Sequence, residues 1–283
     1  MTHSLKRSVS KSLLKALGLS KYFLKAYPIA IENQFEDISR EQIDKLRQLF
    51  ALNVSSNITW KRFGSPGDGG YLLKDEISKS DICISLGIGD DYTFDLDIAK
   101  YCQQVLMFDH TIDYPQLLSS NMSFKKIGIA SVEAENFTTI ERIISELPVE
   151  SDLILKIDIE GAEWEILESL TFYTLRRFKQ IAAEFHNLHA IHNTEHFERI
   201  MNALSKISQT HFLANFHINN WASYQLVAGV PFPDVVEVTY IRRASSSGKQ
   251  VDLENSLNQP NNIDLSNAAS GFITVIEILP SRN

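Results

Sequence analysis

From residue 82 onward, short runs of apolar residues alternate with segments whose apolar residues recur every three or four positions. The short runs predict strands at 82–86, 105–108, 124–129, 153–158, 180–185, 211–216, 235–241 and 272–278. Between two of these runs, Phe197, Ile200, Leu204 and Ile207 have the spacing of one helix face. Strands that alternate with helices predict an α/β fold, with a mostly parallel sheet covered by helices on both faces.

Capping residues mark where several helices are expected to begin. Ser39 with Gln42, and Thr138 with Glu141, have the spacing of a capping box. Thr194 is a third predicted N-cap, since it precedes a long segment of helical periodicity. We therefore expect helices to begin just after these residues.

Composition narrows the class of protein. Of 283 residues, 44% are hydrophobic and 22% charged, as in a globular chain of one large or two small domains. The 35 acidic and 27 basic residues give a net charge of −8, which disfavours a nucleic-acid partner. Cys83 and Cys102 lie in apolar runs and suit a reducing, cytoplasmic compartment. The chain contains no apolar run long enough to predict a transmembrane helix.

The first 26 residues differ from the rest, because they contain six lysine or arginine residues and no acidic residue. Their apolar residues lie close to helical spacing, which predicts a basic amphipathic helix. Such a helix can pack on the main domain, lie on an anionic membrane surface or act as a targeting segment. We predict an N-terminal extension at 1–36 and a catalytic domain at 37–283 with a polar loop at 244–271, while the oligomeric state stays open.

A glycine-containing turn follows the first buried strand. Gly87 and Gly89 lie in the segment SLGIGDD, residues 85–91, where glycine lets the backbone turn tightly and approach a ligand. Asp109 ends the next strand, which is where a carboxylate can hold two ribose hydroxyls in folds of this class. His110, the following residue, is a candidate to flank the adenosine.

The residues around this turn favour one nucleotide over another. A dinucleotide fingerprint needs a small residue where this chain has Tyr92. Asp90 and Asp91 would also repel a pyrophosphate at the start of the next helix. S-adenosylmethionine (SAM) has no phosphate and contains a cationic sulfonium, so it fits an acidic turn better than NAD does.

Acidic and histidine residues lie at the ends of the predicted strands 153–158 and 180–185. Asp158 ends an apolar strand, while Glu184 and His186 are two residues apart and so share one face at the following strand end. Two roles stay open: His186 can be the general base, oriented by Asp158 and Glu184, or these three residues can hold a divalent cation such as Mg²⁺. His217 is a second candidate base. Glu163 and Glu165 are expected to form a charged first turn of the next helix, where the helix dipole favours acids.

A segment with several turn-forming residues, RFGSPGDGGYLL, precedes the first buried strand. It can be a plain connecting loop, or it can close over the amino-acid tail of SAM. In the second interpretation Arg62 pairs with the carboxylate of that tail, because arginine matches carboxylates with two hydrogen bonds. Asp68 or Tyr71 would then contact the polar end of the cofactor.

Several of these segments resemble one family. They are DGGYLL (68–73), SLGIGDD (85–91), FDHTI (108–112), LKIDIEGAEWEIL (155–167), NFHINNW (215–221), VEVTYIRR (236–243) and QPNN (259–262). Together they resemble the FkbM-type SAM-dependent methyltransferases over about residues 60–262.

This resemblance implies a Rossmann-like, seven-stranded and mostly parallel sheet with an antiparallel last strand. It also implies methyl transfer to the hydroxyl of a sugar, glycan or related secondary metabolite. Two other functions are kept open: an NAD(P)-dependent oxidoreductase, and a catalytically inactive SAM-fold module that binds a partner.

Overall fold

The computed structural model describes residues 40–50, 58–66, 69–116, 118–219, 223–227 and 230–244. The predicted extension at 1–36, the polar loop after Ala244 and the predicted strand at 272–278 lie outside the described residues. Asp68, a candidate cofactor contact, also lies outside them.

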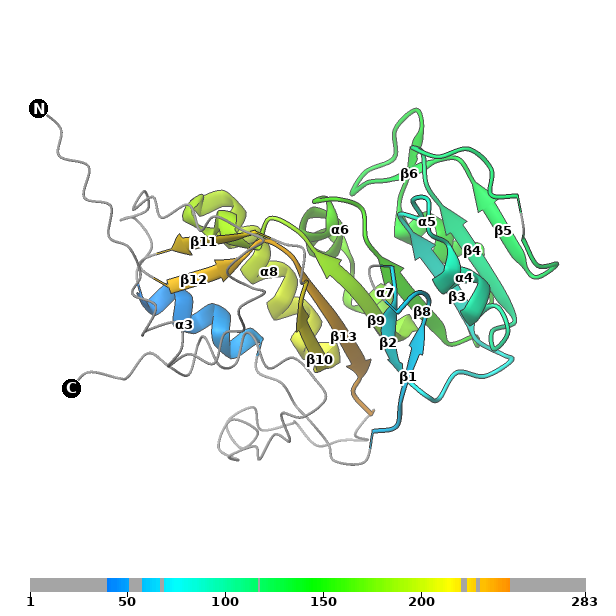
Figure 1. The fold of residues 1–283 in the computed structure, drawn as a ribbon, viewed down its shortest axis with the longest axis horizontal. Coiled ribbons are helices and arrows are strands. Elements are labelled where there is room, and N and C mark those ends of the chain that lie inside the picture. The colour runs from blue at the N-terminus through cyan, green and yellow to red at the C-terminus, as the bar shows by residue number, and fades with distance from the viewer. Residues whose placement is uncertain are drawn as a thin grey trace, which may run out of the picture.

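A seven-stranded sheet forms the centre of the protein (Figure 1). In spatial order its strands are β10 (His211–Ile218), β13 (Val236–Arg242), β9 (Phe178–Phe185), β8 (Leu153–Ile157), β3 (Ile82–Leu86), β4 (Gln104–Phe108) and β5 (Met122–Lys125). All pairings are parallel except those of β13, which is antiparallel to both β9 and β10. The predicted Rossmann-like fold, with its antiparallel last strand, is therefore confirmed.

The order of the strands determines where a ligand can bind. From β3 the chain adds β4 and β5 on one side, then returns to β8 and β9 on the other side. In sheets of this kind the crevice lies at the carboxyl ends of the strands where the winding direction changes. The ends of β3 and β8 are at this point, and both strands are completely buried.

Each face of the sheet is covered by different elements. One face packs against α3 (Arg40–Leu49), α5 (Ile140–Ser145), α6 (Glu163–Ser169), α7 (Phe172–Arg177), the 3-10 helix η1 (Leu188–His192) and α8 (Thr194–Thr210). The opposite face packs against α4 (Thr93–Ile98) and the hairpin of β1 (Trp60–Phe63) and β2 (Tyr71–Lys74). Each layer buries its own apolar core, as amphipathic elements on a sheet require.

Two side chains of the sheet hold the β1–β2 hairpin. The Gln180 side chain accepts the backbone N–H of Lys74 at 2.7 Å and donates to its carbonyl at 3.0 Å. Thr239 donates its hydroxyl to the Leu72 carbonyl at 2.6 Å. These hydrogen bonds attach the backbone of β2 to the sheet. They also hold Tyr71, the first residue of β2, near the carboxyl ends of the parallel strands.

The predicted boundaries differ from the structure at one strand of the sheet edge and at the starts of two helices, among other places. The predicted strand 124–129 is divided, because Gly128–Ile129 (β6) leaves the sheet and pairs with Phe137–Thr138 (β7). Because Thr138 lies in β7, the N-cap of α5 is Thr139, whose side chain accepts the backbone N–H of Arg142. The N-cap of α8 is Asn193, one residue before the predicted Thr194.

A second hairpin, formed by β11 (Tyr224–Val227) and β12 (Val230–Pro233), was not predicted from the sequence. The carbonyl of Asp234, just after β12, accepts the backbone N–H of Leu188 in η1 at 2.9 Å. Within the part of the chain that the structure describes, no helix is long and apolar enough to cross a membrane.

Candidate active site

The turn after β3 requires glycine for two reasons. Gly87 and Gly89 have φ angles of 71° and 60°, in the region that favours glycine. A Cβ atom on Gly87 would also lie 1.6 Å from the backbone carbonyl oxygen of Asp158, so no larger residue fits there. This close approach brings the turn directly against the end of β8.

Asp109 holds the other side of this turn. Its Oδ2 accepts the backbone N–H groups of Ile88 at 2.8 Å and Gly89 at 3.0 Å. Its Oδ1 accepts both the N–H and the hydroxyl of Thr111, at 2.7 and 2.6 Å. Burial opposes the charged form, but these hydrogen bonds outweigh it and lower the pKa of Asp109 to about 2. Asp109 is therefore an ionised acceptor in the place expected for a ribose contact.

His110 lies beside Asp109 and faces an aromatic ring. The ring centroids of His110 and Phe137 are 5.1 Å apart. Gly128 lies between these side chains, since a Cβ atom on it would be 2.4 Å from Phe137 and 3.0 Å from His110 Nδ1. The structure thus forms a small aromatic edge next to Asp109, where the adenosine was expected.

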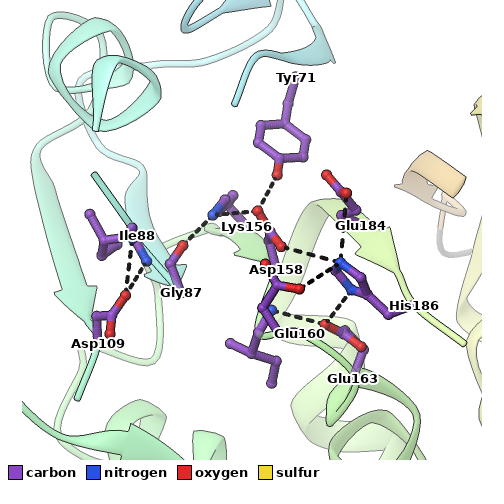
Figure 2. A network of polar contacts seen from close by, with 12 residues as sticks. Tyr71, Gly87, Ile88, Asp109, Lys156, Asp158, Glu160, Glu163, Glu184 and His186 are labelled. Atoms are coloured by element: carbon purple, nitrogen blue, oxygen red, sulfur yellow. Dashed lines mark hydrogen bonds and ion pairs between the residues drawn. The ribbon is translucent and has the colours of Figure 1, made fainter. Parts of the chain in front are cut away.

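Asp158, Glu184 and His186 meet at the ends of β8 and β9, as the sequence predicts (Figure 2). Nε2 of His186 lies 3.7 Å from Glu184 Oε1 and 4.0 Å from Asp158 Oδ1. One potential ligand atom from each residue lies within 4.8 Å of the others. Glu160, which is largely exposed, brings a third carboxylate to 3.4 Å from the same nitrogen.

Glu163 is the main functional candidate that was not predicted from the sequence. It was expected only to form part of a charged first turn of α6, but its side chain is completely buried and contacts His186. Its Oε1 lies 3.1 Å from Nδ1 of His186 and also accepts the backbone N–H of Ile159 at 2.9 Å. The backbone N–H of Gly161 donates to the same carboxylate. With Nδ1 held by this acceptor, Nε2 faces the other three acids.

The surroundings of His186 favour its charged form. Burial alone would lower the pKa of the imidazole, but the hydrogen bond and charge of Glu163 raise it. The charges of Glu184 and Asp158 act in the same direction, and the resulting pKa is about 9. In the free protein at neutral pH, His186 is therefore an imidazolium surrounded by carboxylates.

Tyr71 and Arg62, both expected at the cofactor tail, are found in different surroundings. The Tyr71 hydroxyl donates to Asp158 Oδ2 at 2.8 Å. It therefore reaches the acid cluster directly, meaning the four carboxylates around His186 (Asp158, Glu160, Glu163 and Glu184). Burial and the charges of Asp158 and Glu184 raise the pKa of Tyr71 well above its ordinary value, which keeps the hydroxyl protonated. Arg62 is exposed, and its Nε donates to the Ser65 carbonyl at 2.8 Å within the β1–β2 connection.

His217 was expected in a loop after the sixth strand, but it lies in β10, which continues to Ile218. It pairs in register with Glu237 of β13, which in turn pairs with Glu184 of β9. His217 Nδ1 lies 3.6 Å from Glu237, so a whole strand separates this histidine from Glu184. Asn219 instead reaches the cluster, donating to Glu184 Oε1 at 3.1 Å.

The fold and this site define a Rossmann-like methyltransferase. Residues 72–212 match the model of the methyltransferase FkbM domain, and this part of the chain belongs to that family. SAM-dependent methyl transfer is therefore the general activity of the protein. None of the curated proteins compared with the sequence matches it significantly.

Solved structures with a similar fold are distant in sequence. SMU.1697c from Streptococcus mutans, in complex with SAH, is 12% identical, with a TM-score of 0.34 over 59% of this chain and 89% of that one. The N-methyltransferase NodS from Bradyrhizobium japonicum, also with SAH, is 10% identical, with a TM-score of 0.30 over 73% and 89%. The 23S rRNA methyltransferase ErmE is 12% identical, with a TM-score of 0.35 over 60% and 64%. Similarity at this level says nothing about the acceptor.

Proposed function

We propose that the protein transfers the methyl group of SAM to a hydroxyl oxygen of a sugar, glycan or related metabolite. The observation that carries this proposal is the orientation of His186. Its Nδ1 is held by the buried Glu163, and its Nε2 faces Asp158, Glu160 and Glu184. These groups lie beside the cofactor turn, which is the glycine-containing turn at residues 87–89 after β3. A hydroxyl group must lose its proton when it is methylated, and this nitrogen is in a position to receive it.

The acid cluster also favours a ligand of particular charge. Four carboxylates surround His186, and Lys156 is a second cationic side chain that the described residues place against one of them, Asp158. The excess negative charge suits a sulfonium cation and a neutral acceptor, while it disfavours a phosphate. SAM, when bound, supplies an electrophilic methyl group on a positively charged sulfur.

The proposed reaction is a direct displacement. The acceptor oxygen forms a bond to the methyl carbon while the bond between this carbon and sulfur breaks, with its electron pair leaving on sulfur. The hydroxyl proton passes to Nε2 of His186, which must first be neutral. We expect a positive charge bound among the carboxylates to lower the pKa of His186 from about 9, because two cations then compete for the same acids. Glu163 holds the ring and stabilises the imidazolium that forms.

A divalent cation is the second candidate for this site, and the donor set fits one. Asp158, Glu184 and His186 offer two carboxylates and one imidazole within 4.8 Å. A bound cation would hold the acceptor hydroxyl and lower its pKa. In that case His186 would be a ligand and could not also accept the proton at Nε2.

Calorimetric titration with S-adenosylhomocysteine, with and without Mg²⁺ or Mn²⁺, tests the cofactor and the cation. We expect micromolar binding by the wild type and a large loss in Asp109→Ala. Heat from a metal ion alone that disappears in Asp158→Asn would favour the cation over the free base. Binding of NAD instead, or of neither cofactor, would support the oxidoreductase or the inactive module.

Transfer of labelled methyl from SAM to a panel of neutral sugars and glycans tests the acceptor. His186→Asn should abolish transfer while S-adenosylhomocysteine still binds, and the partly exposed His196→Gln is the matched control. Transfer to amines or RNA with no labelling of any sugar would contradict the proposal.

The basic segment at 1–26 supports an acceptor held at a membrane, such as a lipid-linked glycan. Sedimentation with anionic liposomes tests this proposal. The full-length chain should bind more strongly than a chain that begins at Pro28, and equal binding would contradict it.

A further inference from the structure

Lys156 is a buried lysine at the penultimate position of β8, and it lies between the cofactor turn and the acid cluster (Figure 2). Its ammonium group donates a hydrogen bond to the carbonyl of Gly87, the first glycine of the turn. The same group lies 3.4 Å from Asp158 Oδ2. Lys156 thus contacts both parts of the proposed site with a single charged atom.

The contact with Asp158 determines which way this carboxylate faces. Oδ2 is approached by the Tyr71 hydroxyl at 2.8 Å and by Lys156, while Oδ1 faces Nε2 of His186 at 4.0 Å. Because both donors bind Oδ2, Oδ1 remains directed toward His186. Without Lys156, Tyr71 would be the remaining donor to Oδ2 among the described residues.

The contact with Gly87 holds the turn from the side opposite Asp109. Asp109 binds the N–H groups of Ile88 and Gly89, while Lys156 binds the Gly87 carbonyl. The turn is therefore held by an anion on one side and a cation on the other. Lys156 also influences α4, since burial raises the pKa of Asp95 to about 6 and the charge of Lys156 opposes this rise.

We propose that Lys156 is a positioning residue that holds the Gly87 turn and the Asp158 carboxylate in a fixed relationship, so that the cofactor site and the methyl-transfer site are assembled together. The inference rests on the proposed function, because it requires the cofactor to bind at this turn. It predicts a role in cofactor affinity that an ordinary structural ion pair would not have.

Lys179 provides a matched control at the other end of the sheet. It is also mostly buried and ion-paired, donating to the Glu76 carbonyl and to Asp81 Oδ2, each at 2.6 Å. Lys156 and Lys179 therefore make the same pair of contacts, to one backbone carbonyl and one aspartate. The variants Lys156→Met and Lys179→Met remove equivalent interactions at different places.

The experiment measures S-adenosylhomocysteine affinity by calorimetry, and thermal melting, for the wild type and these variants. We expect Lys156→Met to weaken binding by about tenfold or more, and Lys156→Arg to recover part of it by restoring charged donors. Lys179→Met should lower the melting temperature and leave the affinity unchanged. If Lys156→Met melts below the assay temperature, Lys156→Gln takes its place, because glutamine is polar enough for this buried position but has neither the charge nor the length of lysine.

The proposed function and the role of Lys156 can be overturned separately. If the wild type does not bind S-adenosylhomocysteine, the proposed function itself is overturned. If the wild type binds it and the folded Lys156→Met or Lys156→Gln binds equally well, only the role of Lys156 is overturned. Equal losses of affinity in Lys156→Met and Lys179→Met would also overturn it, since both would then reflect general destabilisation.

Discussion

The carboxylate of Glu163 lies 3.1 Å from Nδ1 of His186, although Glu163 has no exposed surface and follows a sharp turn after β8. Its hydrogen bonds from the Ile159 and Gly161 backbone compensate for burying its charge. The glutamate thus connects the turn before α6 to the histidine at the end of β9. This relationship defines the ring orientation on which the proposed chemistry depends.

Replacing Glu163 with glutamine should lower the pKa of His186 by about one unit or more, because an ionised acceptor is lost from Nδ1. Titration of the histidine ring signals by NMR measures this change from the starting value of about 9. Glu165→Gln is the control, since Glu165 lies in the same helix and contacts Ser131 instead. An unchanged His186 titration in Glu163→Gln would show that the contact does not control the ring.

The raised pKa of His186 also predicts how stability depends on pH. In the unfolded chain a histidine titrates near 6.5, and in the folded protein His186 titrates near 9. The folded state therefore binds the proton more strongly, so the stabilisation is complete below pH 6.5 and is lost as the pH rises through 9. The loss is at most about 3 kcal/mol.

Chemical denaturation at pH 6 and at pH 9.5 measures this difference in the free energy of unfolding. The difference should be smaller in His186→Asn than in the wild type. A wild type that is equally stable at both pH values would mean that the acids do not hold the proton on His186.

Gly87 and Gly89 should respond differently to alanine, although both have positive φ. A Cβ on Gly87 would collide with the Asp158 carbonyl, while a Cβ on Gly89 meets nothing within 4 Å. We expect Gly89→Ala to cost about 1 kcal/mol of stability from backbone strain alone. Gly87→Ala should cost about 3 kcal/mol or more, because the end of β8 must also move. Thermal and urea unfolding measure both, and equal costs would contradict the close approach.

Asp109→Asn should weaken S-adenosylhomocysteine binding by about tenfold or more, because it removes an ionised acceptor that also holds the turn. Asp113→Asn is the matched control, since Asp113 is nearly fully exposed and pairs only with Lys126 among the described contacts. Calorimetry measures both affinities. A loss shared by the two variants would point to general electrostatics rather than a specific contact.

Much of the fold could be predicted because its central strands are buried on both faces. Such strands appear in the sequence as uninterrupted runs of apolar residues. The runs at 82–86 and 153–158 correspond closely to β3 and β8 for this reason. Helix starts were less certain, since two adjacent polar residues, such as Thr138 and Thr139, can each serve as a cap. Which one caps the helix depends on the β6–β7 pairing, a tertiary contact that local sequence does not reveal.

The candidate site was predicted in part. The strand ends place Asp158, Glu184 and His186 together, because carboxyl ends of parallel strands meet at one edge. Glu163 could not be assigned, since an acid at a helix N-terminus can face solvent or fold back under the preceding turn. The small Gly161 and Ala162 beside it were the available signal, as they leave space for the second arrangement. His217 was misplaced because β10 extends two residues beyond its apolar run.

The insertion of β13 between β9 and β10 has a consequence for synthesis on the ribosome. β13 is the last of the seven strands to be translated, yet its partners β9 and β10 are made before it. A nascent chain that stops before Val236 therefore exposes two unpaired strand edges, which are sites for aggregation and chaperone binding. Asn219, which donates to Glu184, is also held through its backbone N–H by the carbonyl of Val235, just before β13. The enzyme should thus become active only after β13 has been synthesised, although the residues of its cofactor turn and acid cluster are translated earlier.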